Sequence, residues 1–258
     1  MNSIFKYTEN NGEVIITGLQ EGVSDTSIVI PETIDGMPVT EIYDYAFCGS
    51  PITDIKIGRN IKVLGKQAFS ECKNLKSAIW NCKCNAIPDY CFYRCTKLKH
   101  FDFSAIKKVG QYAFRESGLQ EVRLPKNIEI LECGTFSRCN GLRSVTWNCK
   151  YNAIPSYCFY MCPNLTNFDF TGIKKIEQDA FGKSGLISVT LNKETAVVQS
   201  CFAYCNSLAK VEWLSARSIK GDIFKECKNI KEIYISDKVK NIEANAFESS
   251  PNAEITFV

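Results

Sequence analysis

Phenylalanine recurs along the chain at nearly constant intervals. Successive members of the series are 21–23 residues apart, and an aliphatic side chain stands five residues before each of them, as Ile87 stands before Phe92. All ten members follow this rule, so the chain is an array of repeats. The ten phenylalanines are Phe47, Phe69, Phe92, Phe114, Phe136, Phe159, Phe181, Phe202, Phe224 and Phe247.

Each repeat also contains a short run in which apolar and polar residues alternate, which is typical of a half-buried strand. Strands that recur only every 22 or so residues cannot be joined by two-residue hairpins. We therefore expect parallel strands stacked in register, one per coil of a solenoid. The apolar pairs expected to point inward are Ile55/Ile57, Ala78/Trp80, Phe101/Phe103, Val122/Leu124, Val145/Trp147, Phe168/Phe170, Val189/Leu191, Val211/Trp213, Ile233/Ile235 and Ile255/Phe257.

The residues just before each phenylalanine, such as Asp89–Cys91 before Phe92, predict a single helical or 3₁₀ turn on the far side of the coil. The predicted fold is a repeat solenoid, β-rich with short helical turns, in which about ten coils of 21–23 residues form one parallel β-ladder. Two strand patterns flank a turn signal at Asn11–Gly12, so residues 1–35 are expected to be an N-terminal capping segment. Residues 36–258 are expected to form a single continuous solenoid domain.

A longer period is superimposed on the coil. Trp80, Trp147 and Trp213 are 67 and 66 residues apart. The third residue after each phenylalanine repeats the order Ser-Cys-Cys with the same spacing, which indicates a duplicated unit of three coils. These residues are Ser50, Cys72, Cys95, Ser117, Cys139, Cys162, Ser184, Cys205, Cys227 and Ser250.

The segment IPETIDGMPVTEIYDYAF at residues 30–47, together with the repeats that follow it, resembles the BspA-like branch of the leucine-rich repeats. The resemblance covers nearly the whole chain, including GEVIITGL at residues 12–19. It implies a right-handed solenoid with an extended strand face, a role in surface adhesion or protein binding, and a cell-surface or secreted location. In other leucine-rich repeats an asparagine is common near the loop after the strand. Isoleucine stands there in this chain, so the asparagine ladder of those classes is not assumed. The replacing residues are Ile61, Ile106, Ile128 and Ile173.

Composition and charge narrow the functional classes. Hydrophobic residues make up 45% and charged residues 23%, an ordinary globular composition without an apolar run long enough to span a membrane. The net charge of +3 provides no general attraction to nucleic acid. Residues Met1 to Asn10 lack the basic patch and apolar stretch of a secretory leader, so no signal peptide is predicted. A cytoplasmic location is therefore the alternative to the one that the resemblance implies.

Fourteen cysteines permit three interpretations. Most occupy two columns of the repeat that they share with serine or alanine, which indicates small buried side chains. Disulfides between stacked neighbours such as Cys72 and Cys95, about 4.8 Å apart, are the first alternative, although parallel side chains match the required torsion poorly. Zinc is the second, although the spacing lacks paired C-x2-C motifs. The four candidate thiols are Cys82, Cys84, Cys91 and Cys95.

The sequence contains no convincing catalytic set. His100 is the only histidine, and no phosphate-binding glycine loop or H-E-x-x-H motif is present. We therefore expect no catalytic, cofactor-binding or metal-binding residues. Lys107-Lys108 and Lys174-Lys175 recur once per three-coil unit. They are interpreted as solvated loop charge, with a phosphate-binding stripe as the alternative.

The outward positions of the strands vary from coil to coil while the inward columns stay apolar. A fixed frame with a varied face suits a non-enzymatic binding module, adhesin-like, for a protein or glycan ligand and not for nucleic acid. The alternative is an intracellular leucine-rich repeat scaffold protein. The sequence leaves the oligomeric state open. The residues expected to bind the partner on the strand face are Ile79, His100, Asp102, Glu121, Arg123, Thr146, Asn167 and Asp169.

Overall fold

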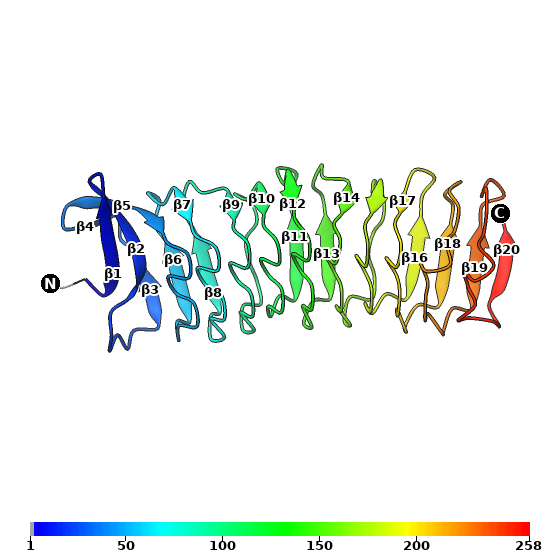
Figure 1. Ribbon diagram of the computed structural model, residues 1–258, viewed down its shortest axis with the longest axis horizontal. Helices are drawn as coiled ribbons and strands as arrows, with labels where there is room; N and C mark the ends of the chain where they lie inside the picture. The colour runs from blue at the N-terminus through cyan, green and yellow to red at the C-terminus, as the bar shows by residue number, and fades with distance from the viewer. Residues whose placement is uncertain (1–2) are drawn as a thin grey trace.

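The computed structural model describes residues 3–258 as an elongated solenoid whose coils follow one another along the long axis, with the chain termini at opposite ends (Figure 1). Most coils have one long strand on one side, and most have a two-residue strand elsewhere on the coil. The strands with four residues or fewer that build the long-strand side are β3 (Ser27–Val29), β6 (Asp54–Ile57), β8 (Ser77–Trp80), β11 (Glu121–Leu124), β13 (Ser144–Trp147), β16 (Ser188–Leu191), β18 (Lys210–Trp213), β19 (Glu232–Ile235) and β20 (Glu254–Phe257).

The long strands pair in parallel and in the predicted register. Val122 of β11 lies opposite Val145 of β13, and Val211 of β18 lies opposite Ile233 of β19. Along β11 the burial alternates, because Val122 and Leu124 point into the core while Arg123 is exposed. The solenoid fold with about ten stacked coils, predicted from the repeat period, is confirmed. The inward pair of β20 is an exception, since Ile255 and Phe257 are exposed at the end of the array.

The long-strand ladder is interrupted twice, where the sequence predicts it to be continuous. It consists of β3-β6-β8, β11-β13 and β16-β18-β19-β20, and no strand forms at residues 100–103 or 167–170. In both gaps an aspartate side chain accepts a hydrogen bond from the backbone amide two residues later. Asp102 Oδ1 accepts a hydrogen bond from the Ser104 amide at 2.9 Å, and Asp169 Oδ1 accepts one from the Thr171 amide at 2.9 Å. Such local turns take the backbone away from ladder geometry.

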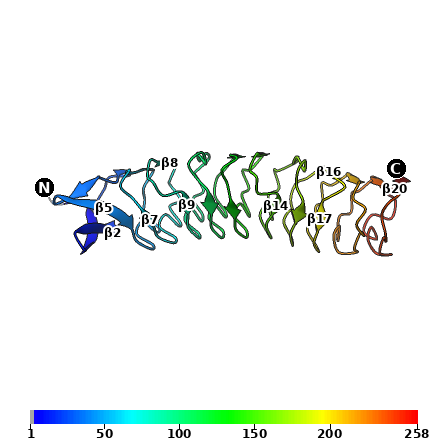
Figure 2. The same ribbon diagram turned by 90° about the horizontal axis from the view of Figure 1, so that it is seen from above.

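A second parallel ladder, which the sequence analysis missed, is built from the aliphatic column that precedes each phenylalanine. Lys108–Val109 pairs with Ala86–Ile87 on one side and with Ile130–Leu131 on the other. The aliphatic residue of each short strand points inward, so this ladder closes the core opposite the first (Figure 2). The short strands are β7 (Val63–Leu64), β9 (Ala86–Ile87), β10 (Lys108–Val109), β12 (Ile130–Leu131), β14 (Ala153–Ile154), β15 (Lys175–Ile176) and β17 (Ala196–Val197).

The segments around the phenylalanines are hydrogen-bonded turns, not the short helical turns expected. In the third coil Tyr90 and Arg94 have left-handed backbone angles, with φ of 55° and 56°. The backbone amides of Tyr90, Phe92 and Arg94 donate hydrogen bonds to carbonyl oxygens of the next coil. The amide of Phe92, for example, donates to the carbonyl oxygen of Ala113 at 2.7 Å. The left-handed residues thus turn every second amide toward the neighbouring coil, which a helix would not permit.

The phenylalanine rings form a continuous stack through the core. Ring centroids of successive members are 5.2–5.9 Å apart and the planes are nearly parallel, at 7–27°. Burying one such side chain stabilises the fold by about 1.5–3 kcal/mol. Because each ring contacts rings only in its own and adjacent coils, the stability of the solenoid arises from the stacking of neighbours.

The N-terminal segment contributes to both ladders. β1 (Phe5–Asn10) and β2 (Glu13–Leu19) form the antiparallel hairpin that the turn signal predicts, with Asn11 and Gly12 at positive φ. β2 then pairs in parallel with β5 (Met37–Ile42), which also pairs with β7 and, antiparallel, with β4 (Thr33–Ile34). β3 pairs with β6, so the long-strand ladder starts within residues 1–35.

Candidate interaction surface

The outward side chains of the long strands lie in rows that run along the solenoid. The register places Lys56 beside Ile79 and Arg123 beside Thr146. We call this surface the long-strand face. It is an open, gently repeating surface on which side chains of neighbouring coils are adjacent, and a ligand could contact several coils at once.

The eight residues predicted for partner binding all lie on this side of the molecule, but on two kinds of backbone. Four belong to strands: Ile79, Glu121, Arg123 and Thr146. The other four lie in the two gaps of the ladder, on exposed backbone without strand pairing: His100, Asp102, Asn167 and Asp169. The structure therefore divides the predicted site into ladder segments with fixed register and two segments without strand pairing.

Charged residues on the long-strand face form ion pairs along single strands. Arg123 Nε lies 2.7 Å from Glu121 Oε1, and Lys210 Nζ lies 2.8 Å from Glu212 Oε1. The Thr190 hydroxyl of the preceding coil also donates to Glu212, at 2.9 Å. The hydrogen bonds from Lys210 and Thr190 lower the pKa of the Glu212 carboxyl. The charges on this face are thus mixed in sign, and two of its strands pair theirs internally.

One exposed apolar position on this face was missed. Val29 of β3 occupies the same row as Lys56 and Ile79, and 58% of its surface is exposed. The sequence analysis assigned it to the capping segment and did not consider its outward position. The alternation around Ile28 and Ile30, two buried residues, is the signal that could have identified it.

The cysteines of the serine-cysteine column are structural. Each donates a hydrogen bond from its buried thiol to the carbonyl oxygen of a phenylalanine in the preceding coil, at 3.0–3.2 Å. All fourteen cysteines are free thiols in the structure. Burial raises the pKa of most of the column thiols, for example that of Cys139 to about 12. The six donors are Cys72, Cys95, Cys139, Cys162, Cys205 and Cys227.

The side chains of Cys82 and Cys84 interact with each other, as do those of the more deeply buried Cys205 and Cys227. The hydrogen bond from the Cys82 thiol lowers the pKa of Cys84 to about 7, whereas burial raises that of Cys149, which lies 67 residues beyond Cys82, to about 11. The structure does not bring Cys91 and Cys95 to this pair. Within residues 3–258 no three histidine, cysteine, aspartate or glutamate side chains lie together where they could hold a metal ion.

His100 has no nucleophile beside it in the described part of the chain. It is exposed, and no serine or cysteine side chain lies within hydrogen-bonding distance of its imidazole. No helix among residues 3–258 is long and apolar enough to cross a membrane.

Comparisons with known proteins agree with this geometry. Residues 21–143, 87–209 and 195–257 match the family model described as BspA type leucine rich repeat region. None of the curated proteins compared with the chain matches it.

Several solved structures have the same fold. A leucine-rich repeat protein from Bacteroides ovatus is 22% identical with a TM-score of 0.70, over 98% of this chain and 80% of that one. A leucine rich cell surface protein from Faecalibacterium prausnitzii is 19% identical with a TM-score of 0.55, over 100% of this chain and 94% of that one. The pneumococcal vaccine antigen PcpA is 13% identical with a TM-score of 0.53, over 100% and 92%.

Proposed function

The chain belongs to the BspA-type leucine-rich repeat family, and on that premise we propose that it is a non-enzymatic, adhesin-like binding module that holds a protein or glycan ligand on its long-strand face. The family consists of repeat proteins that typically serve as interaction or cell-surface modules. The proposal adds the location of the binding surface and the class of ligand.

The observation that supports this proposal is the contrast between the two sides of the same strands. The inward Val122 and Val145 are paired, Val122 fully buried and Val145 half-buried against the core. Their outward neighbours Arg123 and Thr146 are also paired, but both are exposed and chemically different. A rigid frame that varies only outside offers a specific surface at little entropic cost.

The dimensions of the face are adequate for a stable complex. Specific interfaces bury about 800 Å² on each partner. Four or five neighbouring coils could supply that area. We place the predicted contacts between Ile79 and Asp169, which spans both a ladder segment and the two gaps.

We further propose a cell-surface or secreted location. One structural relative is described as a cell surface protein and another as a vaccine antigen. An intracellular scaffold is the second candidate, and the fourteen free thiols favour it because reduced cysteines persist in reducing compartments. The redox state of the natural protein separates these two candidates.

The binding face is tested with arrays of purified extracellular proteins and of glycans, to which the labelled full chain is applied. The array member that binds most tightly is then titrated with a variant in which His100, Glu121, Arg123 and Thr146 are replaced by alanine. We expect a loss of affinity of at least about tenfold with little change in melting temperature.

A matched control replaces four exposed residues by alanine in the turns that connect each phenylalanine segment to the long-strand side. Its positions are Lys73, Lys97, Asn140 and Asn206. Unchanged affinity in the strand-face variant, with loss of affinity in the control, contradicts the proposed binding face.

A further inference from the structure

Lysines and arginines recur along one edge of the solenoid, loop after loop. The loops that leave the long-strand side and lead to the second ladder lie along the upper edge in Figure 1, and we call this edge the basic edge. Each of its nine loops, at residues 58–62, 81–85, 104–107, 125–129, 148–152, 171–174, 192–195, 214–218 and 236–241, contains at least one lysine or arginine. The eleven basic residues are Arg59, Lys62, Lys83, Lys107, Lys126, Lys150, Lys174, Lys193, Arg217, Lys238 and Lys240.

The charge of this edge exceeds that of the whole molecule. The nine loops contain eleven basic and three acidic residues, a formal charge of +8, while the chain as a whole has +3. The remainder of the chain therefore has a formal charge of −5. The whole-chain balance, from which the sequence analysis expected no attraction to polyanions, conceals this separation of charge.

Most of these cations are not neutralised by the protein. Four of them form ion pairs: Arg59 with Glu32, Lys62 with Glu13, Lys107 with Glu129 and Lys174 with Glu194. The others have no ion-pair partner in the part of the chain that the structure describes, and they are exposed or nearly so. These unpaired cations are Lys83, Lys126, Lys150, Lys193, Arg217, Lys238 and Lys240.

The edge is hollowed at the same place in two successive three-coil units. A hollow of about 410 Å³ lies between Lys126 and Lys150, and one of about 610 Å³ lies between Arg59 and Lys83, each pair 67 residues from its counterpart. In both hollows two cations from neighbouring loops flank a shallow depression, and in the second hollow Arg59 is paired with Glu32, which also lines it. The repetition indicates that the depression belongs to the three-coil unit and not to one irregular loop.

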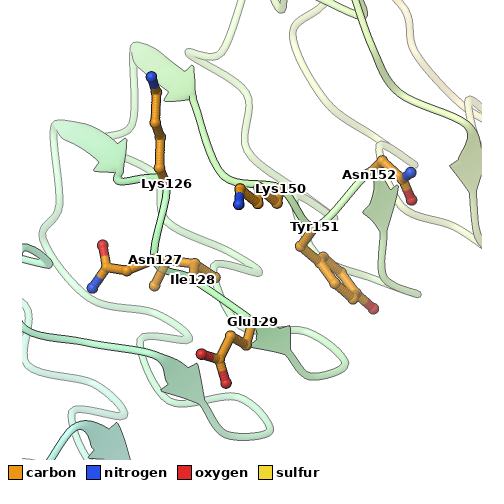
Figure 3. Close-up of a pocket in the computed structure, with 7 residues that line it drawn as sticks. All are labelled: Lys126, Asn127, Ile128, Glu129, Lys150, Tyr151 and Asn152. Carbon is orange, nitrogen blue, oxygen red and sulfur yellow. The ribbon is translucent and has the colours of Figure 1, made fainter.

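The first hollow combines cations with groups that recognise sugars. Figure 3 shows Lys126 and Lys150 on neighbouring loops, with the ring of Tyr151 and the amide of Asn152 on the far side. Glu129 points away from Lys126 in this view, and its carboxylate is held by Lys107 at 3.0 Å. An anionic group can therefore pair with either lysine, while the half-buried ring of Tyr151 and the amide of Asn152 are left to contact a sugar.

We propose that the basic edge binds a linear acidic polysaccharide, with sulfate or carboxylate groups held by the unpaired cations of successive loops. Coils are about 4.8 Å apart, so nine loops form a row of cations about 38 Å long. A flexible chain with regularly spaced anions can follow such a row. This site lies beside the long-strand face and does not depend on the function proposed for that face.

The aromatic content of the edge favours a glycan over a nucleic acid. Single-stranded nucleic acids are held by aromatic platforms on which successive bases stack. Tyr151 is the one aromatic residue in the nine loops. The edge can thus neutralise a polyanion but offers almost no platforms for bases.

The test measures binding of the full chain to immobilised heparin oligosaccharides at several salt concentrations. We expect measurable affinity near 0.1 M salt that falls steeply as salt rises, because bound cations release counterions. The variant Lys126→Gln, Lys150→Gln, Lys193→Gln should lower the affinity and reduce the salt slope by about 1 for each lysine removed. Single-stranded DNA of the same charge serves as the second probe.

The matched control removes three unpaired lysines from the opposite edge, Lys76→Gln, Lys99→Gln and Lys231→Gln, with the same change in net charge. We expect it to bind heparin as the native chain does. No binding of heparin near 0.1 M salt, equal losses in the two triple variants, or tighter binding of DNA than of heparin each overturns the proposal. Loss of heparin binding in the strand-face alanine variant, with native binding in the Lys126, Lys150 and Lys193 variant, overturns it as well.

Discussion

The buried thiol of Cys139 donates a hydrogen bond to the backbone carbonyl oxygen of Phe114, 3.2 Å away in the preceding coil. The contact joins the phenylalanine stack to the serine-cysteine column. The hydroxyl of Ser117 lies 3.4 Å from the same sulfur, so the thiol is enclosed by polar partners of one neighbouring coil. The column therefore links coils in addition to filling space.

Replacing Cys139 by alanine should lower the free energy of unfolding by about 1–3 kcal/mol, because it removes this hydrogen bond and leaves a small cavity. The exposed Cys48 is the control, and its replacement by alanine should change stability by less than about 0.5 kcal/mol. Urea unfolding followed by circular dichroism measures both. Equal effects at the two positions would show that the column does not link the coils.

Replacing Phe114 by alanine should destabilise the protein by about 3–5 kcal/mol. Phe114 is fully buried and stacks on Phe92 with ring centroids 5.2 Å apart and on Phe136 at 5.9 Å. Replacing Arg123, which points outward from β11, should cost less than about 0.5 kcal/mol. Comparable losses in urea unfolding would refute the assignment of inward and outward positions.

Thiol titration should find close to fourteen reactive groups after denaturation without reductant, since all fourteen cysteines are free in the structure. In the folded protein few should react, because ten of them are buried; the exposed Cys48 and Cys84, whose pKa is lowered to about 7, are the ones expected to react. The measurement uses protein purified from its natural source. A denatured count of only a few would establish disulfides and favour an exported protein over an intracellular scaffold.

Alkylation of Cys84 by iodoacetamide should rise with pH through about 7 and level off above that, because the thiolate reacts and its pKa is lowered to about 7 by the Cys82 thiol. Cys149, whose pKa is raised to about 11 by burial, should stay unreactive at neutral pH. Peptide mass spectrometry of both sites over a pH series measures this.

The variant Cys82→Ala removes the thiol that donates to Cys84. The midpoint of Cys84 alkylation should then move to higher pH, while the behaviour of Cys149 stays the same. An unchanged midpoint would show that Cys82 does not stabilise the Cys84 thiolate.

The repeat period was sufficient to predict which residues meet across coils. Phe92 and Phe114 are 22 residues apart and stack because every coil repeats the same path, so the same offset joins neighbours throughout the core. For the same reason the alternation in β11 predicted which of its side chains are buried. In a solenoid the contacts between coils are fixed by one short offset, and a linear pattern is enough to reveal them.

Other features depended on the local backbone and on the path of the chain in three dimensions. The gaps in the ladder arise from side-chain hydrogen bonds of Asp102 and Asp169, which do not disturb the apolar alternation and so left no mark in it. Lys126 and Lys150 are 24 residues apart and unremarkable in sequence. They become neighbours because successive loops turn on the same side of the solenoid, and only that geometry aligns the cations of these loops along an edge of a chain whose overall charge is small.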